Sequence, residues 1–403
     1  MAEKIKGLGG IPEMLYFKNK YKERENHIDN ASSAPLGGLP EINRKAQERH
    51  PEEQVFVIED VIDRASEAKT YVLRRKDGKN PAFFRAGQFV VIRQVVDGKM
   101  IARPVTISCG PALTLEGKMT LTVKLVHDGY LSGYIQENWK PGMEVTTSGP
   151  QGTGYYEPFR DAKHVIACIG GSGITTAFAM ANAIADGDED FDLTIIYGSR
   201  TRDDIMFKKE FDEIERRTDK VRLLNVLSDE NVEGYEHGFI TADLIRKYAD
   251  KFASGEKYSI FAAGPQAMYR FLDGEVSKLG IEQKYYRKEL FGSIKEPWTL
   301  PGYPMEAKDK VFNVHVKMCS REYDIPCSAN ESIITAFERA GIAGPNRCRG
   351  GICGWCRSKL VSGQVFIPEI VDGRREADKV YGYIHPCASF ALSDLTLDVP
   401  AKG

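Results

Sequence analysis

Four cysteines near the C-terminal end of this 403-residue chain constrain its fold most strongly. Three of them, Cys348, Cys353 and Cys356, are crowded into one short loop, and Cys387 follows after a longer stretch of chain. Glycines fill the loop, which lets backbone N–H groups approach the sulfurs closely. Zinc sites usually pair two short C-x2-4-C units, so the sequence favours a thiolate-bound metal cluster. A four-thiolate zinc site and ordinary buried thiols are the alternatives.

The order C-x4-C-x2-C followed by a distant Cys resembles the spacing of plant-type [2Fe–2S] ferredoxins. Two irons bridged by sulfide need four thiolates, and a tight loop aims three of them while the fourth comes from elsewhere. The resemblance implies that Cys348, Cys353, Cys356 and Cys387 hold a [2Fe–2S] cluster, and that the chain moves single electrons.

Composition describes an ordinary globular protein of two or three domains. The formal charge of -2 and the pI near 6.4 give no basic footprint for nucleic acid, and 42% of residues are hydrophobic. The chain has no signal-like apolar start and no apolar run long enough to span a membrane, so we expect a cytoplasmic protein. The other cysteines, Cys109, Cys168, Cys319 and Cys327, are scattered without a disulfide framework.

Changes in pattern along the chain predict five segments. Residues 1–52 are charged and broken by Gly and Pro, and we expect an extension with one helix there. Short strand-like runs over 53–158 predict an antiparallel β-barrel, and alternating strands and helices over 159–293 predict a doubly wound parallel sheet. A linker rich in Pro over 294–310 precedes a last domain, 311–403, which contains the four clustered cysteines.

A glycine-rich turn directly follows an apolar strand in the third segment and opens a helix. Its bare N–H groups and the helix N-terminus can hold a pyrophosphate, whereas a simple tight turn is the alternative. The turn residues predicted to bind a dinucleotide are Gly170, Gly171, Gly173, Ile174 and Thr175.

A second glycine turn, with Gly264, Pro265 and Met268, ends another apolar strand. The carboxyl ends of parallel strands meet at one edge of a sheet, so we expect both turns at the edge where ligands bind. Because a second glycine turn is present, nucleotide binding explains the first turn better than an incidental tight loop does.

Ser199 and Arg200 end the strand between these two turns. Arg200 and Arg202 can clamp an adenosine 2′-phosphate, but surface arginines are commonly just solvated. Asp203 and Asp204 follow directly, so the sequence leaves the choice between NADH and NADPH open.

Two short motifs in the barrel segment resemble flavin motifs of the ferredoxin–NADP reductase superfamily. That family uses Arg-x-Tyr-Ser/Thr for its flavin and Gly-x-x-Ser for the flavin phosphates, and Arg103, Thr106 and Ser132 match. An ordinary strand Arg and a capping Ser are the alternatives. The resemblance implies flavin binding, as FAD or possibly FMN, by Arg103, Pro104, Val105, Thr106, Gly129, Leu131 and Ser132.

With these domains in this order, residues 54–401 resemble the phthalate dioxygenase reductase type of oxygenase reductase. The resemblance implies a β-grasp fold for the C-terminal α+β domain. It also implies that NAD(P)H gives a hydride to the flavin, and that the cluster passes electrons singly to a redox partner protein. We assign no acid, base or nucleophile, only positioning of the hydride near Thr106, Ala263 and Gly264.

Three residues depart from the family pattern. Val105 replaces the usual aromatic, Thr176 stands where a proline is frequent, and Ala263 stands where many members have Cys. We expect Phe291 to lie near the flavin, with an ordinary core position as the alternative.

Two other functions stay open. The chain can be a non-catalytic electron carrier, or it can run in reverse and oxidise a reduced ferredoxin to make NAD(P)H, since direction depends on relative potentials. The acceptor, the oligomeric state and the role of residues 1–52 are not determined by the sequence, although partner docking or self-association is a hypothesis for the extension.

Overall fold

The computed structural model describes residues 11–32, 38–127, 129–289 and 292–400, and divides into a short N-terminal unit, Met1–Gln47, and a main unit, Glu48–Gly403. Helix α1 (Ile11–Asp29) lies in the short unit, and its apolar side chains from Leu15 to Ile28 are exposed. The sequence predicted a helix here. It did not predict α2 (Glu41–Arg49), which has no buried residue and little apolar pattern to reveal it.

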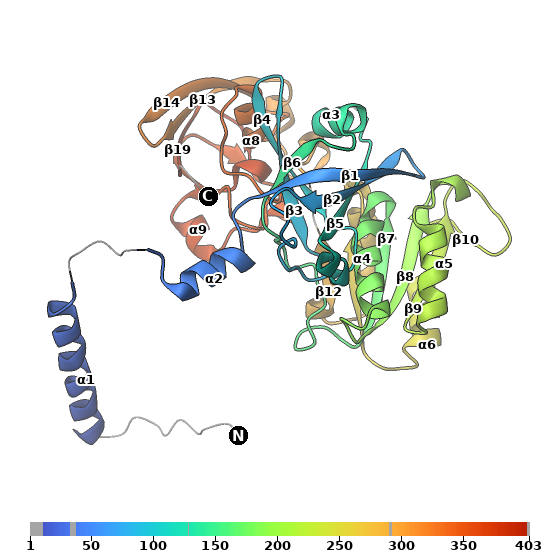
Figure 1. Ribbon diagram of the computed structural model, residues 1–403. Coiled ribbons are helices and arrows are strands. Elements are labelled where there is room, and N and C mark those ends of the chain that lie inside the picture. Colours follow the sequence, from blue (N-terminus) through green and yellow to red (C-terminus); the bar gives the residue numbers. More distant parts are fainter. Residues whose placement is uncertain (1–10, 33–37, 128, 290–291, 401–403) are drawn as a thin grey trace. The chain divides into compact units, whose positions relative to one another are not determined.

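An antiparallel sheet of six strands begins the main unit, in the order β4-β3-β6-β1-β2-β5 (Figure 1). Its ends close on each other through a bridge between Ile107 and Leu121, next to a 2.9 Å hydrogen bond from the Ser108 N–H to the Thr120 carbonyl. The closed sheet confirms the predicted β-barrel. The strands are β1 (Gln54–Arg64), β2 (Ala68–Arg75), β3 (Phe89–Val96), β4 (Lys99–Thr106), β5 (Lys118–Lys124) and β6 (Glu144–Thr147).

Alternating burial explains the barrel. Phe56 and Ile58 in β1, and Tyr71 and Leu73 in β2, point inward at every second position and are almost fully buried. Helix α3 (Tyr130–Asn138) contributes Leu131 and Ile135 to the same core. Gly129 is the residue before its first turn, as the sequence predicted.

A six-stranded parallel sheet follows, in the order β10-β9-β8-β7-β11-β12. Its central strands are buried on both faces, which is why they read as continuous apolar runs. This confirms the predicted doubly wound domain. The strands are β7 (His164–Gly170), β8 (Asp192–Ser199), β9 (Val221–Leu227), β10 (Glu236–His237), β11 (Tyr258–Ala263) and β12 (Tyr286–Glu289).

Helices cover both faces of this sheet. Helices α4 and α5 pack on one face with Val165, Ala167 and Ile169, whereas α6 and α7 pack on the other with Ile166 and Cys168. Successive residues of β7 therefore serve opposite cores. The helices are α4 (Ile174–Ala185), α5 (Lys208–Arg217), α6 (Ala242–Phe252) and α7 (Gln266–Ser277).

The C-terminal part has a five-stranded mixed sheet, β14-β13-β19-β15-β17, and a two-stranded sheet, β16-β18. Helix α8 (Ile333–Arg339) packs into its core through buried Ile333, Ile334 and Phe337. This is the α+β arrangement implied by the ferredoxin resemblance. The remaining elements are β13 (Val311–Met318), β14 (Arg321–Ser328), β15 (Ser358–Ser362), β16 (Val365–Phe366), α9 (Glu376–Val380), β17 (Tyr383–Ile384), β18 (Phe390–Ala391) and β19 (Leu395–Val399).

No helix within the described ranges is long and apolar enough to cross a membrane.

A buried ion pair joins the segment after the barrel to the parallel sheet. The Asp161 side chain is fully buried, and its Oδ2 lies 3.1 Å from Arg287 Nη1 on β12 and 3.0 Å from Arg160 Nη2. Arg287 Nη1 also donates a 2.9 Å hydrogen bond to the Tyr155 carbonyl. Because a buried charge needs a partner, these contacts fix the edge strand β12 against the chain that leaves the barrel.

We expect Asp161→Asn to lower the free energy of unfolding by about 3 kcal/mol, since it leaves a buried guanidinium without its counter-charge. Denaturant unfolding measures the difference. The matched control is Asp190→Asn, because Asp190 pairs with Lys220 but is 71% exposed, and we expect a much smaller loss there. Equal losses in the two variants would contradict the role given to Asp161.

Candidate functional site

The loop between α8 and β15 brings the four predicted cluster cysteines together. Cys348, Cys356 and Cys387 are buried and Cys353 is exposed. The sulfurs of Cys356 and Cys387 lie 3.4 Å apart. Cys348 makes side-chain contacts with Cys353 and Cys387, and these contacts lower the pKa of its thiol, while the contact with Cys348 raises the pKa of the Cys353 thiol.

These contacts fit a cluster with two irons. Cys348 contacts Cys353 and Cys387, and Cys387 contacts Cys356, so the four thiols form one connected set that would hold a [2Fe–2S] cluster. Among the described residues, no group of three or more His, Cys, Asp or Glu is arranged to hold a single metal ion.

The backbone of the cluster loop is tightly constrained. The Gly350 N–H donates a 3.4 Å hydrogen bond to Cys348 Sγ. Gly351 has a φ of 80°, and a Cβ there would lie 2.1 Å from the Val371 carbonyl oxygen, so only glycine fits. The His385 ring, through Nδ1, contacts the Gly351 carbonyl at 2.5 Å, which ties the loop to the segment that carries Cys387.

The predicted flavin residues lie on two elements of the barrel. Arg103, Pro104, Val105 and Thr106 end strand β4, where Thr106 is buried and the other three are partly exposed. Ser132 lies in the first turn of α3, and its Oγ accepts a 3.1 Å hydrogen bond from the Val126 N–H.

The turn before α3 is too tight for a side chain at Gly129. A Cβ there would lie 2.5 Å from Ser132 Oγ and 2.7 Å from the Val126 carbonyl oxygen. Because the first N–H groups of a helix have no partner within it, an exposed helix start of this kind suits a phosphate. Leu131 is instead buried in the barrel core.

The two glycine turns meet at the carboxyl edge of the parallel sheet, as the sequence predicted. A Cβ at either Gly170 or Gly264 would lie 2.6 Å from Met268 Sδ, and one at Gly173 would lie 2.3 Å from the Ala263 carbonyl oxygen. The turns therefore touch through their backbones, and side chains would separate them. Gly171, with a φ of 52°, joins β7 to the helix that begins at Ile174 and Thr175.

Both arginines after β8 are already paired. Arg200 Nε lies 3.6 Å from Asp204 Oδ2, and Arg202 Nε lies 3.4 Å from Glu230 Oε2. Ser199 Oγ, in contrast, is buried without a hydrogen-bond partner among the described residues. A polar ligand at this edge would satisfy it.

Comparisons with known proteins agree with this geometry. Family models match an oxidoreductase FAD-binding domain over residues 57–156, an oxidoreductase NAD-binding domain over 167–273, and a 2Fe-2S iron-sulfur cluster binding domain over 316–392. These three domains, in this order, support the resemblance to the ferredoxin–NADP reductase superfamily. The chain is an NAD(P)H-dependent oxidoreductase with an FAD and a [2Fe–2S] cluster, which favours an enzyme over a non-catalytic carrier.

Relatives of this reductase match most of its length. The glycine betaine monooxygenase reductase subunit of Chromohalobacter salexigens is 28% identical over 328 residues, covering 78% of this chain and 87% of that protein. The ferredoxin reductase component of 3-ketosteroid-9-alpha-monooxygenase from Mycolicibacterium smegmatis is 26% identical over 347 residues, covering 84% and 94%. The solved structure of phthalate dioxygenase reductase, 21% identical, has the same fold, with a TM-score of 0.62 and coverage of 86% of this chain and 98% of that one.

One residue of the reductase site had no signal in the sequence. Glu289 ends β12, and its carboxylate accepts a hydrogen bond from Thr176 on α4. A Cβ at Gly154 would lie 3.1 Å from its Oε1, so the carboxyl group lies between α4 and the chain leaving the barrel. Burial raises the pKa of this carboxyl to about 7.

Sequence reasoning named the segment around Glu289 only for its aromatic, Phe291, which lies outside the described residues. A carboxyl group that titrates near neutral pH beside the two nucleotide turns is typical of functional sites. Thr176, noted as a departure from the frequent proline, is the donor that this carboxylate uses.

The raised pKa predicts a pH-dependent stability. Its folded value of about 7 exceeds the ordinary value of 4.5, so the protonated carboxyl favours the folded state. That contribution is complete below about pH 4.5 and is lost as the pH rises through 7. We therefore expect Glu289→Gln to be more stable than the natural protein at pH 8, by about 3 kcal/mol, and similar to it at pH 4.5.

Denaturant unfolding of the reductase at the two pH values measures this. Glu213→Gln, at an exposed position on α5, is the control and should show no difference that depends on pH. A Glu289→Gln variant whose stability difference is the same at both pH values would rule out the titration.

Proposed function

We propose that this reductase is the electron-supplying component of an oxygenase system, with NADH as its donor and a separate oxygenase protein as its single-electron acceptor. The observation that carries the proposal is the packing of the cluster ligand Cys348 directly against Phe89 and Val91 of the barrel strand β3. This contact brings the cluster loop and the flavin barrel together within one chain. The names of the oxygenase reductase relatives support the acceptor class.

The chain's own residues hold and align the reacting groups. When bound, FAD and the cluster supply hydride acceptance and single-electron transfer, which amino acids do not provide. In the proposal, Arg103, Thr106 and the start of α3 hold the flavin. The turns at Gly170 and Gly264 hold the nucleotide so that its hydride faces the flavin.

The cluster ligands in the proposal are the four cysteines of the C-terminal domain. The proposal also includes the domain limits 53–158, 159–293 and 311–403, and a location in the cytoplasm.

The charge around the end of β8 supports NADH over NADPH. Asp204 and Glu230 pair with the two arginines that would otherwise hold an adenosine 2′-phosphate. Asp204 is fixed by a further 2.9 Å hydrogen bond from Ser66 Oγ. Bringing a 2′-phosphate to this place would set its charge against two carboxylates.

We expect kcat/KM for NADH to exceed that for NADPH by at least tenfold, about 1.4 kcal/mol of discrimination. We expect Glu230→Gln to narrow this ratio, because it frees Arg202 and removes one negative charge. Initial rates of flavin reduction under anaerobic conditions give both values. Glu233→Gln, which changes a nearby exposed glutamate, is the control. A natural protein that prefers NADPH would refute the assignment of NADH.

The proposed electron path predicts a separation of two activities. We expect Cys353→Ser to abolish reduction of a one-electron acceptor protein while leaving NADH-dependent bleaching of the flavin in place. Cys319→Ser is the matched control, because Cys319 is also exposed but lies in the turn between β13 and β14. Visible spectra of the anaerobic protein before and after NADH, with an oxygenase component as the acceptor, separate the two steps.

The same spectra test the alternatives. A protein that binds no flavin would support the carrier function and overturn this proposal. Fast reduction of NAD⁺ by a reduced ferredoxin, with no net flow from NADH to an oxygenase, would support the reverse direction. Extraction of the bound flavin distinguishes FAD from FMN.

A further inference from the structure

One buried carboxylate connects the flavin barrel to the C-terminal domain. Glu338, on α8, is 8% exposed, and its two oxygens accept hydrogen bonds of 2.8 and 3.0 Å from Arg103 Nη1 on β4. Asn346 Nδ2 donates a further hydrogen bond of 3.1 Å to Oε1. Helix α8 and strand β4 also contact each other directly (Figure 1).

The same carboxylate pairs with a second arginine, in the cluster loop itself. Arg349 follows the cluster ligand Cys348, is 3% exposed, and places Nη1 2.8 Å from Glu338 Oε1. Its Nη2 donates a 2.9 Å hydrogen bond to Thr335 Oγ1, and its Nε donates one of 3.3 Å to Ser293 Oγ. Arg349 therefore contacts α8 and the segment that follows the nucleotide domain.

Arg349 also adopts a backbone conformation that side chains rarely take, with a φ of 55°. A residue other than Gly or Asn keeps such a conformation only where its surroundings fix it. The ion pair with Glu338 and the hydrogen bonds to Thr335 and Ser293 are what fix it here. The conformation of the cluster loop at Cys348 thus depends on contacts made by the next residue.

Of the three guanidinium nitrogens of Arg103, only Nη1 is used by protein groups within the described residues. Its Nη1 is used by Glu338 and by the Ala102 carbonyl, at 2.8 Å each. Its Nε and Nη2 make no hydrogen bond within the described part of the chain. Because a guanidinium is a planar fork that can bind two anionic groups at once, this free edge suits a phosphate.

We propose that Glu338 is a positioning residue that links flavin binding to docking of the cluster loop. It holds Arg103 with one edge turned to the flavin phosphate, and it holds Arg349 so that Cys348 packs on the barrel. The inference rests on the proposed function, in which each transfer moves one electron from the reduced flavin to the oxidised cluster. Because the cluster would take one electron at a time, the acceptor protein would have to reoxidise it before the flavin gives its second electron and releases its proton to water.

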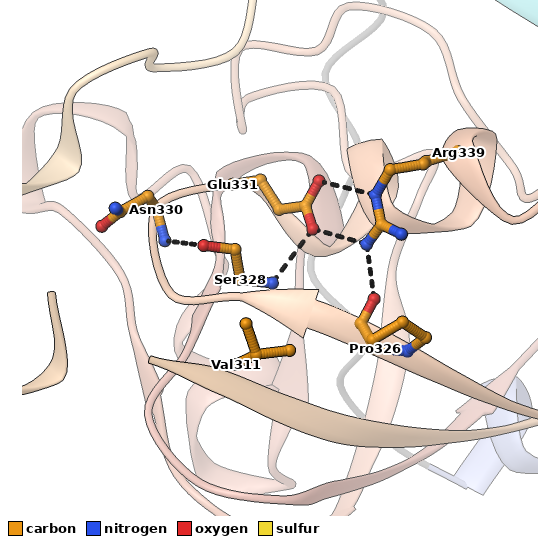
Figure 2. A pocket seen from close by; sticks show the side chains of 6 residues that line it. All are labelled: Val311, Pro326, Ser328, Asn330, Glu331 and Arg339. Carbon is orange, nitrogen blue, oxygen red and sulfur yellow. Dashed lines mark hydrogen bonds and ion pairs between the residues drawn. The ribbon is translucent and has the colours of Figure 1, made fainter. Parts of the chain in front are cut away.

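The alternative is an ion pair that only stabilises the C-terminal domain. Another pair in that domain provides the matched control. Glu331 and Arg339 lie 2.7 Å apart, and Glu331 also accepts a hydrogen bond from the Ser328 N–H (Figure 2). Glu331 precedes the same helix and Arg339 ends it, and within the described ranges neither forms a hydrogen bond or ion pair with the barrel or the cluster loop.

The experiment compares Glu338→Gln and Glu331→Gln in the full-length protein carrying its FAD and cluster. After anaerobic mixing with NADH, we expect Glu338→Gln to slow cluster reduction at least fivefold while flavin reduction keeps its natural rate. We expect the FAD dissociation constant to rise at least threefold. Glu331→Gln should match the natural protein in all three values, and Glu338→Asp should recover part of the loss.

A second measurement does not depend on activity. Hydrogen exchange of the α8 amides, with FAD bound and after its removal, reports whether the flavin site and the C-terminal domain are linked. We expect FAD to slow this exchange in the natural protein and in Glu331→Gln, but not in Glu338→Gln, since coupling between two sites is reciprocal.

The outcomes separate the inference from the function. The linkage would be overturned if hydrogen exchange of the α8 amides in the natural protein were the same with and without FAD. It would also be overturned if Glu338→Gln behaved like Glu331→Gln. Either result would leave the reductase function intact. A Glu338→Gln variant that slows flavin and cluster reduction equally would also overturn it, since that result indicates general damage. A natural protein whose flavin NADH does not reduce would overturn the proposed function itself.

Discussion

The buried carboxylate of Glu338, placed between two guanidinium groups, is the interaction on which the arrangement of the domains depends. A buried charge without partners costs several kcal/mol, so Glu338, Arg103 and Arg349 are stable only together. Glu338 and Arg349 come from a helix and from the loop that follows it, whereas Arg103 comes from a barrel strand 235 residues before Glu338. The apolar contact of Cys348 with Phe89 needs the same alignment, so charge pairing and packing require one docking geometry.

The carboxyl edge of the parallel sheet depends on a different constraint, which is contact between the backbones of the two glycine turns. Strands β7 and β11 are parallel neighbours, so their carboxyl ends, and the glycine turns that follow, must come together. Because Gly170 and Gly173 have no side chains, the two turns touch through their backbones. Glu289, at the end of β12, accepts a hydrogen bond from Thr176 on α4, and burial raises its pKa to about 7.

The sequence predicted what is encoded locally and missed what is assembled from distant segments. The cysteine spacing and the strand–turn–helix pattern at Gly170 lie within short stretches, so the cluster loop, the two glycine turns and all three domain folds could be predicted. Glu338 and Glu289 read as ordinary glutamates of a helix and a strand, because their partners lie far away in the chain. Helix α2 was missed for another reason, since a helix that buries nothing has no apolar stripe.

The cluster loop has one buried side and one exposed side. In the proposed function, this difference would separate the place where electrons enter the cluster from the place where they leave it. Cys348 is 2% exposed and faces the barrel strands, whereas Cys353 is exposed and has the half-exposed Ile352 beside it. Under the proposed function, electrons from the flavin would enter at the side closed by protein, and a separate acceptor would approach the exposed side. The contacts of Arg349 fix the loop at its closed side, so the open side is free to meet a partner without disturbing the entry point.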